Sequence, residues 1–196
     1  NRVGFPFKKT HITKSDYDAT AVLTLLKQWY IVLEVAQRGS SPTKDNFHPK
    51  EYLYDIGILK ILRETVIPKI SAVNTLDEKL RSPLGGLIEN AVLLNMLEGK
   101  GGFYEINGWK NKLHKEVDFI YKDNALTIPI EVKASLKITN RHAKNLLSYL
   151  SEHKLKVGIL ISMDKPKNMK MSGFNIINIP AYLFSQNIIT VVGNLL

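Results

Sequence analysis

The sequence predicts an α/β domain over residues 81–196, built from a mixed sheet with helices packed on it. Three observations predict this class: a nearly all-apolar helix, three closely spaced strands after it, and a second helix followed by a continuously apolar strand. The predicted order is therefore helix, three strands, helix, strand.

The first helix of this domain is predicted to begin at Ser82-Pro83 and to end at Gly99. Serine is a good N-cap, proline suits the first helical position, and glycine commonly follows the last turn. The apolar side chains between them leave little polar surface; they are Leu84, Leu87, Ile88, Ala91, Val92, Leu94 and Leu97. This helix is expected to be largely buried.

The remaining elements of the domain follow in quick succession. Strands are predicted at 102–107, 116–121 and 126–134, a helix at 140–153, a strand covered on both faces at 157–162, and a strand with a short helix at 174–184.

Residues 1–80 are predicted to form a separate, small helical segment. Helical spacing is clear over 16–29, an extended stretch follows to about residue 37, and residues 39–49 form a loop. Residues 51–65 begin extended and continue as a short helix, and 66–82 wrap the surface. Because the chain starts without methionine, we expect a fragment of a longer protein or a processed product.

The composition is that of a soluble globular protein, with 44% hydrophobic and 23% charged residues. There is no cysteine, which excludes disulfides and thiolate metal sites. No apolar run has the length of a membrane-spanning helix, so a cytoplasmic protein without membrane contact is expected.

The net charge of +9 points to a polyanionic partner. Residues 81–196 hold 15 Lys and Arg against 9 Asp and Glu, whereas residues 1–80 hold 12 against 9. This bias fits a nucleic acid, and the alternative is a solubilising surface.

Candidate chemistry lies on two neighbouring strands. Glu131 and Lys133 are two residues apart, so both side chains leave the same face of a strand, and Asp118 lies on the preceding strand. If the strands pair, these side chains are expected to enter one cleft. Adjacent carboxylates repel unless a cation intervenes, and hard oxygen ligands suit Mg²⁺ or Mn²⁺. Lys133 would then orient a water or stabilise a phosphoryl oxygen.

Glu89 is the fourth candidate, because a carboxylate on an apolar helix needs a partner or a metal. Each of these residues alone has a plainer interpretation: Glu-x-Lys as a solvated strand face, and Glu89 reaching water at the helix edge. Their combination favours a site.

This pattern resembles the PD-(D/E)XK, or restriction-endonuclease-like, nuclease superfamily, with Asp118 and Glu131-Val132-Lys133 as its motifs and Glu89 as its helix glutamate. The chain looks most like the C-terminal domain of unknown function of archaeal-type AAA ATPases, on the stretches KEYLYDIGILKIL, LGGLIENAVLLNML, EVDFIY and IPIEVKAS. The resemblance implies a metal site of Glu89, Asp118, Glu131 and the Val132 backbone carbonyl. It also implies a winged-helix-like segment within residues 1–80 and an ATPase domain upstream.

Two functions remain. We favour metal-dependent hydrolysis of DNA; the alternative is a catalytically weak or inactive DNA- or protein-binding module of an ATPase. Lys137, Arg141 and Lys144 could contact phosphates or form a solvated helix surface. Trp109 could stack on a base or anchor a hairpin.

Overall fold

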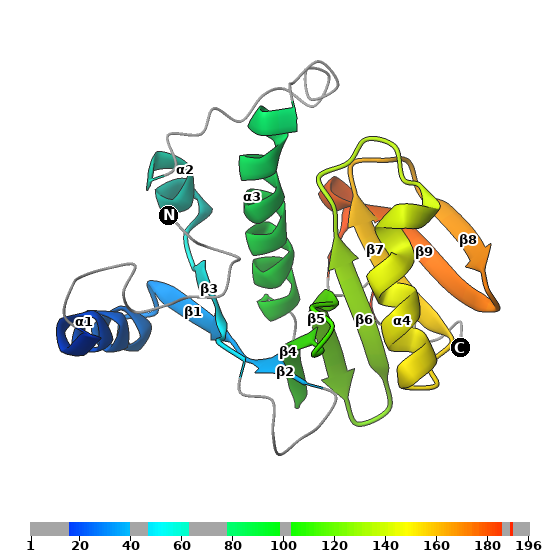
Figure 1. Cartoon of the computed structure of the whole chain (residues 1–196). Helices are drawn as coiled ribbons and strands as arrows, with labels where there is room; N and C mark the ends of the chain where they lie inside the picture. The colour runs from blue at the N-terminus through cyan, green and yellow to red at the C-terminus, as the bar shows by residue number, and fades with distance from the viewer. Residues whose placement is uncertain (1–15, 40–46, 63–77, 99–102, 186–188, 190–196) are drawn as a thin grey trace.

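A seven-stranded mixed sheet lies between two helices in the computed structural model (Figure 1). The structure describes residues 16–39, 47–62, 78–98, 103–185 and 189. None of the helices in these ranges is both long and apolar enough to cross a membrane.

The strand order of the sheet is β2-β4-β5-β6-β7-β9-β8. The strands are β2 (Gln37–Arg38), β4 (Tyr104–Lys110), β5 (Glu116–Asp123), β6 (Thr127–Val132), β7 (Val157–Ser162), β8 (Lys167–Met171) and β9 (Phe174–Pro180). The pairs β2–β4, β6–β7 and β7–β9 are parallel and the others antiparallel, which confirms the predicted mixed sheet.

Helix α3 (Glu78–Leu97) covers one face of the sheet and α4 (Lys144–Glu152), preceded by a 3₁₀ turn at Asn140–Ala143, covers the other (Figure 1). Leu93 and Met96 of α3 belong to one core cluster with Phe119 and Ile130, and Leu146 of α4 belongs to the second core cluster, on the opposite face. The predicted helix start at Ser82-Pro83 is wrong, because α3 begins at Glu78. A proline inside a helix removes one backbone hydrogen bond, and burial of the apolar turns that follow outweighs that loss.

The described part of residues 1–80 contains α1 (Asp16–Gln28), α2 (Ile56–Leu62) and an antiparallel pair of β1 (Val32–Val35) with β3 (Lys50–Leu53). These elements match the predicted helix, extended stretch and short helix. The segment also contributes to the larger core, because β2 extends the sheet and Tyr52 packs with α3. The boundary at residue 80 and the winged-helix-like character stay predictions, and most of 66–82 lies outside the described residues.

Strand β8 is an element that the sequence did not predict. It pairs antiparallel with β9 at the edge of the sheet, and most of its side chains are exposed. An exposed edge strand needs no apolar alternation, so the pattern that reveals a strand is weak there.

A buried carboxylate–lysine network

A network of buried carboxylates and lysines begins at the point where β5 and β6 stop pairing, beyond Phe119 and Ile130. The β4–β5 pairing slips by one residue between Asn107 and Trp109, next to Asp118 on the partner strand. Val117 packs with the α4 core cluster and Phe119 with the α3 cluster, so the bulge breaks the alternation of β5. The Val132 N–H donates to Asp118 Oδ2 at 2.8 Å, so the Asp118 carboxylate accepts a hydrogen bond that a backbone carbonyl of the neighbouring strand would otherwise accept.

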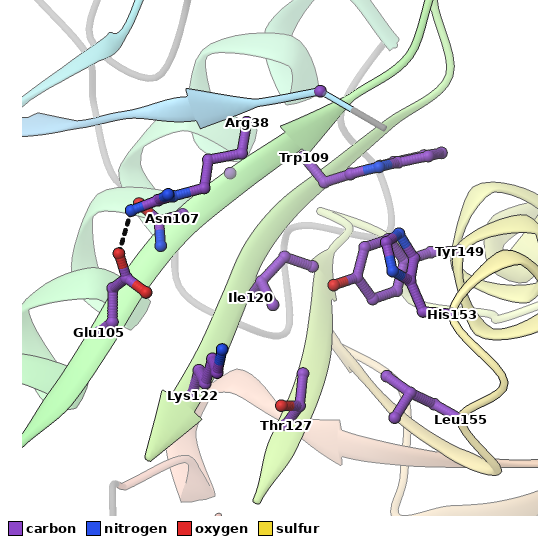
Figure 2. A pocket seen from close by; sticks show the side chains of 12 residues that line it. Arg38, Glu105, Asn107, Trp109, Ile120, Lys122, Thr127, Tyr149, His153 and Leu155 are labelled. Atoms are coloured by element: carbon purple, nitrogen blue, oxygen red, sulfur yellow. Dashed lines mark hydrogen bonds and ion pairs between the residues drawn. The ribbon is translucent and has the colours of Figure 1, made fainter. Parts of the chain in front are cut away.

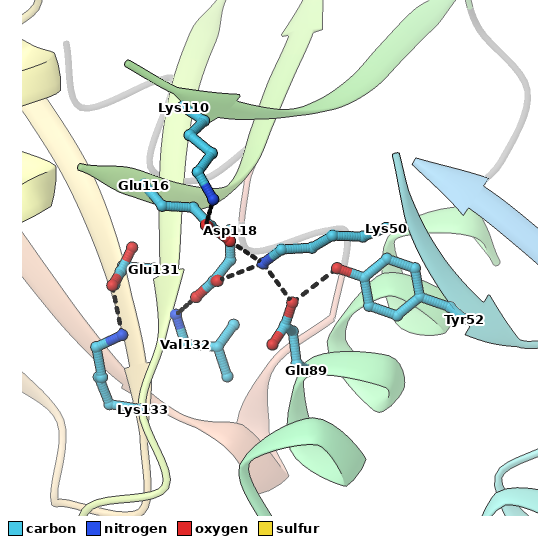
Figure 3. Close-up of polar contacts among 9 residues, drawn as sticks. All are labelled: Lys50, Tyr52, Glu89, Lys110, Glu116, Asp118, Glu131, Val132 and Lys133. Carbon is cyan, nitrogen blue, oxygen red and sulfur yellow. Dashed lines mark hydrogen bonds and ion pairs between the residues drawn. The ribbon is translucent and has the colours of Figure 1, made fainter. Parts of the chain in front are cut away.

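Lys50 lies at the centre of the network (Figure 3). Its Nζ is 3.0 Å from Glu89 Oε1, 2.6 Å from Glu116 Oε1 and 3.1 Å from Asp118 Oδ1. The residue is only 2% exposed. The ammonium donates hydrogen bonds to Glu89 and Asp118 and forms an ion pair with Glu116.

Strand β3 carries this lysine into the core. Lys50 and Tyr52 are two residues apart and leave the same face of β3, and the Tyr52 hydroxyl donates to Glu89 Oε1 at 2.7 Å. Asn90 holds the end of the strand: its Oδ1 accepts from Leu53 N at 2.8 Å and its Nδ2 donates to Leu53 O at 2.7 Å. Helix α3 therefore fixes both the position and the register of β3.

Glu131 and Lys133 form a separate ion pair with each other. Their neighbours Ile130 and Val132 pack toward α3, so the pair points the other way, and Figure 3 shows it across β6 from Glu89 and Lys50. Glu131 is 2% exposed, and its Oε2 has no hydrogen-bond partner among the described residues.

The electrostatics of the network follow from burial and charge. Burial, followed by the charge of Asp118, raises the pKa of Glu131 to about 8 and that of Glu89 to about 7. Burial alone would lower the pKa of Lys50, but Asp118, Glu89 and the other neighbours hold it well above its ordinary value. Burial would raise the pKa of Asp118, yet Lys50 and Lys133 keep it below its usual value. Lys50 is therefore a permanent cation and Asp118 a permanent anion.

The predicted metal ligands do not fit one ion in this arrangement. Among the residues that the structure describes, no three His, Asp or Glu side chains are grouped to hold a metal. Both Asp118 oxygens are already bonded, to Lys50 and to the Val132 N–H. The predicted convergence of all four residues in one cleft stays a prediction. Glu89 and Asp118 both bond to Lys50, whereas Glu131 pairs with Lys133, and the charge of Asp118 still reaches Glu131 and raises its pKa.

The phosphate-contact candidates gather at the carboxyl ends of the parallel strands β6 and β7. Lys137, Arg141 and Lys144 are exposed on the connection into α4, and Lys165 and Lys167 are exposed after β7. Two hydrogen bonds join these connections, Met163 N to Ser135 O at 2.9 Å and Ile138 N to Asp164 Oδ2 at 2.8 Å. We call the five basic residues the basic rim.

A pocket of about 340 Å³ lies on the α4 face of the sheet (Figure 2). Trp109, 2% exposed, meets Tyr149 edge-on at 5.2 Å between ring centroids, and Tyr149 stacks on His153 at 4.1 Å. Trp109 therefore anchors the β4–β5 hairpin against α4 and has no free face on which a base could stack.

Sequence reasoning missed three members of the network, Lys50, Tyr52 and Glu116. The only local signal was the Lys-x-Tyr spacing in KEYLYD, which places both side chains on one face of a strand.

Fold and network together define an α/β domain whose buried carboxylates are held by lysines. A domain family of unknown function, DUF4143, matches residues 84–182, about half of the 196-residue chain. The chain belongs to this DUF4143 family. Among curated proteins no match was found.

Proposed function

We propose that this chain is a DNA-binding module with a restriction-endonuclease-like core, attached in its native protein to a cytoplasmic AAA-type ATPase. The order α3, β4, β5, β6, α4, β7 supports that core. The observation that carries the proposal is the pairing of every carboxylate in the expected catalytic set: Glu89 and Asp118 with Lys50, and Glu131 with Lys133. Carboxylates that are paired in this way are neutralised within the fold, without a bound metal.

The basic rim supports DNA as the ligand. Its five cations are exposed to solvent at one end of the sheet. Asp164, the acidic residue between them, accepts hydrogen bonds from the backbone N–H groups of Ile138 and Lys165. Open α/β sheets commonly bind ligands beyond the carboxyl ends of their parallel strands. Exposed lysine and arginine side chains bind phosphates without reading sequence.

Replacing Lys137, Arg141 and Lys144 together with alanine should lower the affinity for duplex DNA at low salt by about tenfold or more. It should also reduce the slope of log affinity against log salt concentration by about three, because three phosphate contacts are lost. Fluorescence anisotropy over a salt series measures both quantities. The matched control is the triple alanine variant of Lys122, Lys154 and Lys170, which removes the same charge at the amino ends of β6, β7 and β9. Equal losses in both variants would exclude a localised DNA site at the basic rim.

A second candidate function is hydrolysis of DNA phosphodiester bonds with Mg²⁺ or Mn²⁺ as cofactor. Glu131 favours it, because a buried carboxylate oxygen without a partner beside a lysine is costly in a purely structural role. The arrangement described above does not hold the metal, so Asp118 and Glu131 would have to rearrange when DNA binds.

A nicking assay on supercoiled, linear and branched DNA decides between the two functions. Under the module proposal, purified protein leaves all three intact with Mg²⁺ or Mn²⁺, also when the ATPase is restored. Under the second candidate, wild type cleaves, whereas Lys133→Ala and Glu131→Ala lose cleavage and keep their DNA affinity. Cleavage by wild type and by both variants alike would exclude these residues as the active site.

A further inference from the structure

We infer that Lys50 is a built-in cation, which takes the place of a divalent metal ion at the junction of β3, α3 and β5. The expected metal ligands Glu89 and Asp118 are both present and close together, but a lysine from the N-terminal segment lies between them. The inference concerns how the carboxylates are neutralised. It does not depend on whether the domain binds DNA, and it is incompatible with the metal-dependent candidate.

The geometry around the ammonium is that of a filled site. Three carboxylates from two elements surround Lys50 Nζ at 2.6 to 3.1 Å, Glu89 from α3 and both Glu116 and Asp118 from β5. The ammonium donates two hydrogen bonds, to Glu89 and Asp118, and forms an ion pair with Glu116; the side chain is only 3% exposed, which leaves little room for water around it.

A lysine held in this way has an advantage over a free ion. Binding a free ion costs translational freedom and the removal of its waters, whereas Lys50 is already fixed by its strand. Two contacts further along β3 secure its position: the Tyr52 hydroxyl donates to Glu89, and Asn90 bonds to the backbone of Leu53. The carboxylates that the sequence pattern assigned to a metal are therefore neutralised from within the chain.

Lys110 is a matched control for Lys50, because it pairs with Glu116, one of the same three carboxylates. Its Nζ is 3.2 Å from Glu116 Oε2, but its side chain is 20% exposed, and within the described part of the chain it forms no ion pair with Glu89 or Asp118. Removing Lys110 takes away the same charge and leaves Lys50 among its three carboxylates.

The test compares wild type, Lys50→Met and Lys110→Met in the whole chain, by thermal unfolding and by Mn²⁺ titration followed by electron paramagnetic resonance. We expect EDTA, Mg²⁺ and Mn²⁺ to leave the Tm of wild type unchanged and wild type to bind no stoichiometric Mn²⁺. Lys50→Met should lower the Tm by about 10 °C, because it leaves buried carboxylates without their cation. Excess Mn²⁺ should restore about 5 °C and bind at one site per chain.

Lys110→Met should show a small loss of Tm and no response to Mn²⁺. A Lys50→Met protein that keeps the Tm of wild type, or that binds no Mn²⁺, would overturn the inference. If Lys50→Met does not fold even with Mn²⁺ present, the two cations are not interchangeable and the inference fails. Stoichiometric Mn²⁺ binding by wild type would also overturn it and would favour the metal-dependent candidate, whereas loss of DNA binding alone would leave it intact.

Discussion

Replacing Glu131 with glutamine should stabilise the domain at alkaline pH and leave its stability unchanged in acid. Burial and the charge of Asp118 raise the pKa of Glu131 from 4.5 to about 8 in the folded state. A carboxyl with a raised folded pKa contributes stability that is fully present below about pH 4.5 and is lost as the pH rises through about 8. Glutamine has a similar size and does not titrate, so it avoids this loss.

The Tm difference between Glu131→Gln and wild type should grow from near zero at pH 4.5 to roughly 5 °C above pH 8. Lys133 tolerates the loss of its partner because 35% of its side chain is exposed to water. Glu98→Gln is the control, since it neutralises an exposed glutamate of the same protein. A gain that is equal at both ends of the pH range would mean that Glu131 is not a buried charge in the folded state.

Replacing Asn90 with alanine should destabilise the domain by about 2–4 kcal/mol. The side chain is fully buried, and the substitution leaves both the N–H and the carbonyl of Leu53 without their partner. A buried polar group that loses its hydrogen bond costs about 1–3 kcal/mol, and two such groups are affected here. Urea unfolding followed by circular dichroism measures the free energy of unfolding.

Asn95→Ala is the matched control for this prediction, because it lies on the same helix and makes one longer hydrogen bond, 3.4 Å from Nδ2 to Phe184 O. It should cost less than about 1 kcal/mol. Equal losses for the two variants would mean that Asn90 does not hold β3 in place and that its effect is only that of shortening a helix side chain.

Most of the secondary structure could be predicted because its signals are local. The apolar run at 157–162 and the short polar links between strands gave β4 to β7 in the right order. The start of α3 could not be predicted, since the Ser82-Pro83 pair carries a strong capping signal and nothing nearby reveals that the helix begins before it.

The candidate network could be predicted only in part. Glu89 and Asp118 were expected to lie close together, and both bond to Lys50. Lys50 itself was not foreseen, because a lysine at the start of a strand is usually solvated, and its partners lie 39 and 68 residues away. Long-range neutralisation of charge leaves no periodic trace in a sequence.

The position of Glu131 shows a second limit. The Glu-x-Lys spacing correctly placed Glu131 and Lys133 side by side. The prediction that Asp118 shares their cleft assumed unbroken alternation along β5, and the slip of register between Asn107 and Trp109 breaks that alternation, so the shared cleft stays a prediction. A bulge of one residue reverses the face of every side chain beyond it, and its place is set by the packing of neighbouring strands.

The path of the chain from β1 into β2 has a mechanical consequence. A single residue, Ala36, separates the two strands, and its carbonyl accepts from Gly108 N at 2.8 Å. Tension applied to α1 would therefore pass along one extended stretch of backbone to the edge of the sheet. The load would reach the four residue pairs of β1 with β3 before it reaches β2. Within the seven-stranded sheet, the two residue pairs of β2 with β4 would separate before the longer β4–β5 ladder, so this edge is where the sheet would begin to open.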